Sequence, residues 1–257
     1  MGAEDAKQAI YTQTQTDIAN AMPDPGWSPR QKLALAARIL FAEGHGSGLA
    51  GQITSRQDAA TFWTIAFGFG FDEATASNSI RVDAAMKVHE GKGFPNPANR
   101  FHAWIYGARP EACAIVHTHA PWVNALSIVG EPLAVAHMDS TPLYNDVAYL
   151  KDWPGVPVAD DEGRIISEAI GDKRAILLAH HGMLTLGSSI EEATMLAIFM
   201  ERAAAMQMRA RAIGPIQPIP AAHAQEAHDF LLTPMVVNAT FNYFARGALR
   251  GAIDVLV

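Results

Sequence analysis

Two histidines separated by one residue follow a short apolar run near the middle of the 257-residue chain. Residues 113–116 are small, apolar and partly β-branched, a pattern that predicts a buried strand. Side chains alternate between the two faces of a strand, so His117 and His119 should point the same way. Two imidazoles on one face, at the end of a buried strand, are half of a potential metal site.

A second apolar run supplies a third imidazole. Residues 175–179 read AILLA and are followed by His180, His181 and Gly182. Adjacent strand residues face opposite ways, so only one of these two histidines can share a metal with the first pair. Gly182 would let the backbone pass close to that site or turn away from it. Three neutral imidazoles suit zinc, and also manganese, iron, cobalt or nickel, with an open position that is typical of a catalytic metal.

Composition restricts the class of protein. Apolar residues make up 49% and charged residues 18% of the chain, which predicts a compact globular protein with a single core. A net charge of −7 without a long basic run argues against nucleic acid and anionic membranes as partners. The single cysteine, Cys113, excludes an internal disulfide framework, and we expect it to be a small buried residue.

The start of the chain has no signal-peptide pattern, and no stretch of about 18 apolar residues occurs anywhere. Together with the lone cysteine, this predicts a cytoplasmic protein without a transmembrane helix.

Periodicity predicts mixed α and β structure. Residues 1–27 are polar and then proline-rich, which predicts an arm and a turn. Ser28 and Gln31 form a capping box that opens a helix ending at Gly44, and Ser189 and Glu192 form another that opens a helix to about residue 213. We further expect strands near 62 and at 79–83, loops at 87–99 and 156–162, helices at 101–108, 122–128 and 164–170, a linker at 214–220, and a helical segment at 221–249 interrupted near residue 234.

The residues around the histidines resemble the class II aldolase/adducin family. RFHAWIYGARPEACAIVHTHAPWVNALS and AILLAHHGMLTLGSSIEEA carry the resemblance, which runs from about residue 30 to about residue 214. It implies an α/β/α fold with a central, mostly antiparallel β-sheet flanked by helices. It divides the chain into an N-terminal arm (1–27), the family domain (28–214) and a C-terminal helical extension (215–257) that packs on the same domain or on a neighbouring subunit.

The same resemblance implies that His117, His119 and His181 bind a divalent metal ion and that His180 faces outward. Family members form tetramers with the metal site between adjacent subunits, so a homotetramer is expected here. Zinc is the first choice of metal, with manganese or iron as alternatives.

A glycine-rich segment at residues 45–56 is a simple loop or a cradle for an anionic group. In sugar-phosphate aldolases of the family the corresponding loop reads roughly Gly-Thr-Ala-Gly-Asn and binds the substrate phosphate, whereas residues 48–52 here read GLAGQ. The partner Ser-Ser of that phosphate site falls on Asn96 and Pro97. The departures imply a substrate without a phosphate ester, with Gly51, Gln52 and Asn96 as substrate-binding candidates.

A second departure concerns proton transfer. Aldolases and epimerases of the family place a carboxylate a few residues before a Phe-His pair, and that position is Ala98 here. His102 is either a hydrogen-bonding residue at a helix start or a proton-transfer group beside the metal. Arg100 either pairs with a substrate carboxylate or is a surface charge.

Three further candidates come from the pocket wall and subunit contacts implied by the resemblance, and a fourth, Trp122, comes from its aromatic side chain. Asp139 and Tyr144 are catalytic candidates, and Trp122 is a substrate-binding candidate that suits an aromatic substrate. Tyr243 could complete a neighbouring subunit's site or simply pack at an interface.

The favoured function is a metal-dependent lyase that breaks a C–C bond next to a carbonyl in an unphosphorylated aromatic, 2-oxo or hydroxy acid, most simply by decarboxylation. The alternatives are retro-aldol cleavage of a hydroxy-keto acid, non-haem iron oxygenation and a non-catalytic adducin-like scaffold. The three retained histidines favour an enzyme over a scaffold. The expected partner is a small carboxylic acid substrate.

Overall fold

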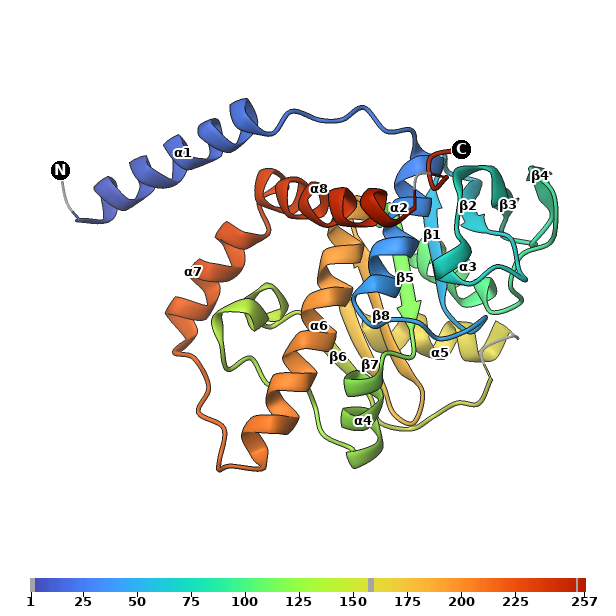
Figure 1. The fold of residues 1–257 in the computed structure, drawn as a ribbon. Helices are drawn as coiled ribbons and strands as arrows, with labels where there is room; N and C mark the ends of the chain where they lie inside the picture. The colour runs from blue at the N-terminus through green and yellow to red at the C-terminus, as the bar shows by residue number, and fades with distance from the viewer. Residues whose placement is uncertain (1–2, 157–159, 253) are drawn as a thin grey trace.

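The computed structural model describes residues 3–156, 160–252 and 254–257. An eight-stranded sheet in the order β4-β3-β2-β1-β5-β8-β7-β6 forms its centre (Figure 1). Every strand pair is antiparallel except β6 with β7. The strands are β1 (Gln52–Arg56), β2 (Thr61–Ile65), β3 (Ser79–Asp83), β4 (Val88–Glu90), β5 (Ala114–Thr118), β6 (Val147–Leu150), β7 (Ala175–Leu178) and β8 (Gly182–Gly187).

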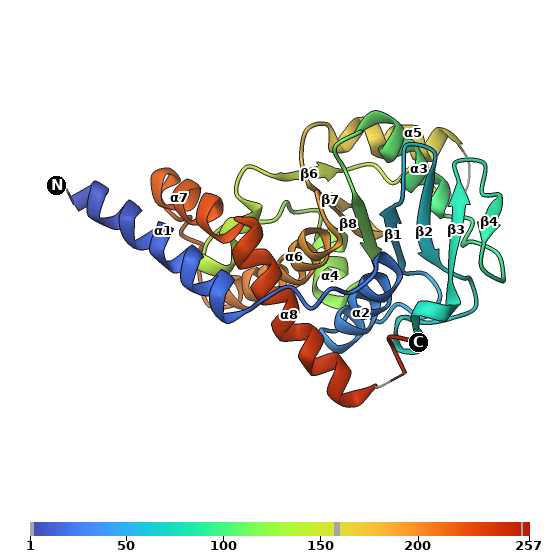
Figure 2. The same ribbon diagram turned by 90° about the horizontal axis from the view of Figure 1, so that it is seen from above.

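Helices cover both faces of the sheet, which confirms the α/β/α fold (Figure 2). One apolar cluster joins the sheet to α2, α4, α6 and α8, and the other joins it to α3 and α5. The α-helices are α1 (Ala3–Ala21), α2 (Pro29–Ala42), α3 (Asn99–Ala108), α4 (Pro121–Val129), α5 (Asp160–Ile170), α6 (Ile190–Arg211), α7 (Ala221–Leu231) and α8 (Pro234–Gly251), with short 3-10 turns η1 (Phe71–Glu73), η2 (Ala76–Asn78) and η3 (Met138–Leu143).

The arm expected at the N-terminus is the helix α1, which reaches away from the sheet beside α7 and α8 (Figure 1). Tyr11 ties it to α7, since its hydroxyl donates to Glu226 at 2.8 Å and its ring lies 4.6 Å from that of Phe230. The C-terminal extension packs on this chain, because α8 lies against α2 and α6. Across the part of the chain that the structure describes, no helix is long and apolar enough to cross a membrane.

Helix ends follow the sequence signals closely. Ser28 caps α2, and its capping box with Gln31 is complete, while Gly44 has a φ of +90° just beyond the helix. Ser189 caps α6 by accepting from Glu192 N at 3.1 Å. The second half of that capping box was wrong, because the Glu192 carboxylate accepts from Ser188 N at 2.7 Å and pairs with Arg174 at 2.6 Å instead.

Four other expectations need correction. Residues 52–56, expected to belong to the glycine-rich loop at 45–56, form the strand β1. The segment 87–99 contains the short strand β4, which pairs with β3. Cys113 is exposed and not buried, and it lies directly before the start of β5 at Ala114. Residues 160–162 of the expected loop 156–162 already belong to α5, and residues 157–159 lie outside the described residues.

Candidate metal centre

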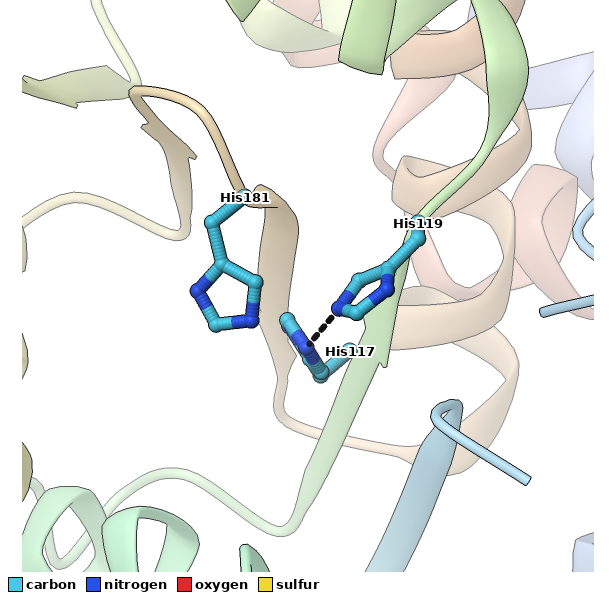
Figure 3. A group of neighbouring side chains, drawn as sticks. All are labelled: His117, His119 and His181. Atoms are coloured by element: carbon cyan, nitrogen blue, oxygen red, sulfur yellow. Dashed lines mark hydrogen bonds between the residues drawn. The ribbon is translucent and has the colours of Figure 1, made fainter. Parts of the chain in front are cut away.

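Three histidine rings form a nearly equilateral triangle at one end of the sheet (Figure 3). His117 lies on β5, His119 follows that strand directly, and His181 lies in the turn between β7 and β8. The ring centroids are 5.0 Å apart for His117 and His119, and 4.8 Å apart for each of these with His181. One ligand nitrogen from each ring lies within 4.8 Å of the others, so the three histidines converge on one point.

A backbone contact fixes the tautomer of His117. Its Nδ1 lies 2.8 Å from the carbonyl oxygen of Met183, which can only accept, so Nδ1 carries the proton and Nε2 presents a lone pair. The Nε2 atoms of His117 and His119 lie 3.1 Å apart. Two nitrogens bound to one tetrahedral zinc ion are separated by about 3.3 Å, as Zn–N bonds of about 2.05 Å require. The donor set therefore fits a divalent ion.

Burial keeps the three rings neutral, which is the form that binds metal. Desolvation is the main cause that lowers the pKa of His117 well below its ordinary value, and the neighbouring imidazoles lower it further. Burial also lowers the pKa of His119, and burial together with His119 lowers the pKa of His181 to about 4.

The conformation of the hairpin between β7 and β8 determines which of the two adjacent histidines faces the cluster. His180 is exposed at the tip of the turn with a φ of +58°, and His181 faces the other rings. Gly182 follows at the start of β8, and a Cβ atom there would lie 2.5 Å from the carbonyl oxygen of Thr118 and 3.0 Å from the His119 ring. Only glycine lets the two histidine segments approach this closely.

Two residues that the sequence did not single out hold the backbone around His119. Ser47 Oγ accepts from His119 N at 3.0 Å. His45 is fully buried, and its Nδ1 lies 2.9 Å from the hydroxyl of Thr118. The signal was available in the HGSG run at residues 45–48, but its glycines predicted a simple loop or a cradle for an anionic group, not a support for the histidines.

A cavity of about 550 Å³ opens beside the three histidines. Gln52, directly opposite His117 across β1 and β5, lines it, and its buried Oε1 has no hydrogen-bond partner. Asn96 also lines the cavity and holds its wall, donating to Leu49 O and accepting from Ala98 N, both at 3.0 Å. The lining residues are Ser47, Leu49, Ala50, Gln52, Phe67, Asn96, Pro97, Ala98, His117, His119, Val156 and His181. Among these described residues none carries a carboxylate or a permanent positive charge.

The residues of α3 divide between its two faces. His102 is fully buried under the helix, with Nδ1 2.8 Å from Thr54 Oγ1 and with an unpartnered Nε2, and burial lowers its pKa to about 3. It neighbours the histidines through Phe101, whose ring lies 5.1 Å from that of His117, but it does not line the cavity. Arg100 lies on the other face of α3, on a separate cavity with Trp104 and Asp160.

The other predicted site residues do not meet the histidines within one chain. Asp139 belongs to η3, which packs against α6 and α7. Tyr144 precedes β6, whose first residue pairs with Ala175 at the start of β7. His181 follows the other end of β7, so Tyr144 lies at the opposite end of the sheet from the histidines. Trp122 is exposed on α4 with Arg209 over its ring, and Tyr243 is 61% exposed on α8. Gly51 packs on the Phe71 ring and does not line the cavity.

Comparisons with known proteins agree with this architecture. The sequence profile described as Class II Aldolase and Adducin N-terminal domain matches residues 31–208. Over 189 residues the chain is 32% identical to a 4-hydroxy-3-prenylphenylpyruvate oxygenase/4-hydroxy-3-prenylbenzoate synthase of Streptomyces roseochromogenus subsp. oscitans (72% of this chain, 67% of that one) and, over the same length, 32% identical to decarboxylase NovR of Streptomyces niveus (72% and 69%).

Among solved structures, L-fuculose 1-phosphate aldolase from Glaciozyma antarctica PI12 superimposes with a TM-score of 0.81 at 30% identity, covering 89% of this chain and 91% of that one. An aldolase II superfamily protein from Pseudomonas syringae gives a TM-score of 0.80 at 26% identity, covering 92% and 98%. The fold is thus that of a class II aldolase-like protein. The chain belongs to the class II aldolase/adducin family.

Proposed function

We propose that this protein is a divalent-metal-dependent lyase that breaks the C–C bond next to a carbonyl in an unphosphorylated carboxylic acid, and that it does so by decarboxylation. His117, His119 and His181 would hold the ion, with zinc as the first choice. When bound, a divalent ion acts as a Lewis acid that stabilises negative charge on the substrate's carbonyl oxygen.

The observation that carries the proposal is the composition of the cavity wall. No described lining residue is a carboxylate, and Ala98 occupies the position from which a carboxylate would reach the cavity. Aldol cleavage requires removal of a hydroxyl proton, for which a positioned base is useful. Decarboxylation requires no such base: the bond to the carboxylate breaks, carbon dioxide leaves, and the carbon that keeps the electron pair takes up a proton.

The chain's own residues would bind and orient such a substrate. Leu49, Phe67 and Val156 provide an apolar wall that suits an aromatic or hydrocarbon side chain. The unpartnered Oε1 of Gln52 can accept a hydrogen bond from a hydroxyl group on the substrate. The wall provides no cationic cluster for a phosphate ester among its described residues, which favours an unphosphorylated substrate.

A second candidate is metal-dependent oxygenation. Its support is the first relative described above, which is a 4-hydroxy-3-prenylphenylpyruvate oxygenase/4-hydroxy-3-prenylbenzoate synthase. Iron would replace zinc at the same three histidines in that case.

The test is carbon dioxide release from a panel of aromatic 2-oxo and hydroxy acids, with and without oxygen. Oxygen-independent release supports the decarboxylase. Release that requires oxygen and iron supports the oxygenase, and an aldehyde or ketone product without carbon dioxide contradicts both and indicates a retro-aldolase.

We also propose a homotetramer, in which Tyr243 of one subunit lies at an interface. Its exposure on α8 is compatible with such a contact. Sedimentation analysis tests the assembly, and a monomer at micromolar concentration would contradict it.

A further inference from the structure

The helix that follows His119 has no cap of its own. α4 begins two residues after His119, and its N-cap position is Ala120, which makes no side-chain hydrogen bond. The first N–H groups of a helix have no partner within the helix and need one from elsewhere. Pro121 has no N–H group, so Trp122 and Val123 present the first donors that must be satisfied.

Glu201, in the middle of α6, supplies the missing acceptors. Its Oε1 accepts from Trp122 N at 2.9 Å and its Oε2 accepts from Val123 N at 2.8 Å. The side chain is 6% exposed, and no cationic side chain pairs with it among the described residues. Burying an unpaired carboxylate is unfavourable, and burial raises the pKa of Glu201 although the two N–H groups oppose this. Burial of the Glu201 carboxylate is thus energetically unfavourable, and its two hydrogen bonds to the start of α4 offset part of this cost.

The start of α4 is linked in turn to the backbone of His119. Asn124, in the first turn of the helix, donates from Nδ2 to the carbonyl oxygen of His119 at 3.3 Å. On its other side, His119 N donates to Ser47 Oγ at 3.0 Å. The peptide groups flanking His119 are therefore held by hydrogen bonds on both sides. The hydrogen bond from Asn124 depends on the position of α4, which Glu201 holds at its first turn.

We propose that Glu201 is a positioning residue for the metal centre: by capping α4 from α6, it fixes the backbone of His119 and so the direction of its Nε2 lone pair. The inference rests on the proposed function, because it takes His119 as a metal ligand. Glu201 itself does not line the cavity and acts only through α4 and Asn124.

The test compares two substitutions of the same kind on the same helix. Glu201→Gln keeps the volume but turns an acceptor into an NH₂ group that faces a backbone N–H, so one of the two capping bonds is lost. Glu191→Gln is the matched control, because Glu191 is also 6% exposed on α6 but pairs with Lys32 at 2.7 Å, on a different cavity. Zn²⁺ affinity is measured by competition with a chromophoric chelator, and the visible spectrum of the Co²⁺-loaded protein reports ligand geometry.

Glu201→Gln should weaken Zn²⁺ binding by about tenfold to a hundredfold, as loss of groups that orient a ligand does elsewhere, and should alter the Co²⁺ spectrum. Glu191→Gln should leave both unchanged while lowering thermal stability. If Glu201→Gln does not fold, Asn124→Ala removes the contact to His119 alone and should also weaken Zn²⁺ binding.

Two failures are distinguishable. An unaltered protein that binds no Zn²⁺ would overturn the proposed function and this inference with it. The second failure is one in which the unaltered protein binds Zn²⁺ and Glu201→Gln and Asn124→Ala bind it as tightly as Glu191→Gln. This outcome would overturn the positioning role of Glu201 and leave the proposed function standing.

Discussion

The Nε2 atoms of His117 and His119 lie 3.1 Å apart, and the Nδ1–H group of His117 donates to Met183 O at 2.8 Å. The His117 lone pair therefore faces the other ring at a separation that suits a shared cation. Burial lowers the pKa of both rings and so favours the neutral form that binds metal. The pair is the strongest structural argument that the cluster binds a metal.

Removal of a ligand should abolish tight metal binding. His119→Ala and His181→Ala should each weaken Zn²⁺ affinity by more than about a hundredfold, since loss of supporting groups alone costs 10–100-fold. Isothermal titration with Zn²⁺ measures the effect. His180→Asn is the control, because His180 is exposed at a φ of +58° that asparagine tolerates. Equal loss of affinity in the control would mean that His180 is the ligand.

Gly182→Ala should disturb the centre sterically. The added Cβ would lie 2.5 Å from Thr118 O, which belongs to backbone and has no room to shift, so the free energy of unfolding should fall by about 1–3 kcal/mol. Zn²⁺ affinity should fall too, because the same atom would contact the His119 ring. Gly214→Ala has nothing within 4 Å of the added atom and serves as the control. Urea unfolding and Zn²⁺ titration that showed no difference between the two variants would contradict the packing described.

A carboxylate introduced into the cavity wall should lower the activity of an enzyme whose substrate is a carboxylic acid. Ala98→Glu would bring a negative charge toward the substrate carboxylate, and repulsion of about 1–4 kcal/mol corresponds to a loss of about fivefold to several hundredfold in kcat/KM. Ala98→Gln has the same shape without the charge and should retain more activity. Steady-state carbon dioxide release measures both, and a gain of aldol cleavage in Ala98→Glu would instead favour the retro-aldolase.

His102 should make stability depend on pH. Its pKa is lowered to about 3 in the folded protein, whereas an unfolded histidine titrates near 6.5. Between pH 3 and pH 6.5 the unfolded chain therefore binds more protons than the folded protein. The contribution of His102 to the free energy of unfolding is complete above pH 6.5 and declines by about 1.4 kcal/mol per pH unit as the pH falls toward 3.

The variant His102→Gln removes this dependence. It should be less stable than the unaltered protein at pH 7.5, and the gap should shrink by about 2 kcal/mol at pH 5 in urea unfolding. His223→Gln, on the exposed side of α7, is the control and should leave the pH profile unchanged. A gap between His102→Gln and the unaltered protein that stays constant with pH would contradict the buried neutral state of His102.

Much of the secondary structure could be predicted from short-range sequence signals. The capping box at Ser28 and Gln31, the left-handed Gly44 and the strand at residues 79–83 all depend on short-range geometry, and all are confirmed. Errors arose where the sequence pattern is weak. Cys113 directly precedes β5 and is exposed, and the short strand β4 pairs with β3 although its sequence is largely polar and followed by glycines.

The candidate site divides in the same way. His117 and His119 could be placed together from strand periodicity, and Gly182 indicated the close approach of the third histidine. Asp139, Tyr144, Trp122 and Arg100 could not be placed, because only the packing of η3, α4 and α3 decides which way they face. The support given to His119 by Ser47 and Glu201 was invisible too, since it joins residues 72 or more positions apart.

The most direct test of the metal centre is the metal content per chain, measured by elemental analysis of protein purified without chelator. We predict about one divalent ion per chain, lost in His119→Ala and kept in His180→Asn. Zinc would favour the lyase and iron the oxygenase. A chain that holds no metal, even after soaking with Zn²⁺, would contradict the central claim that the three histidines form a metal centre.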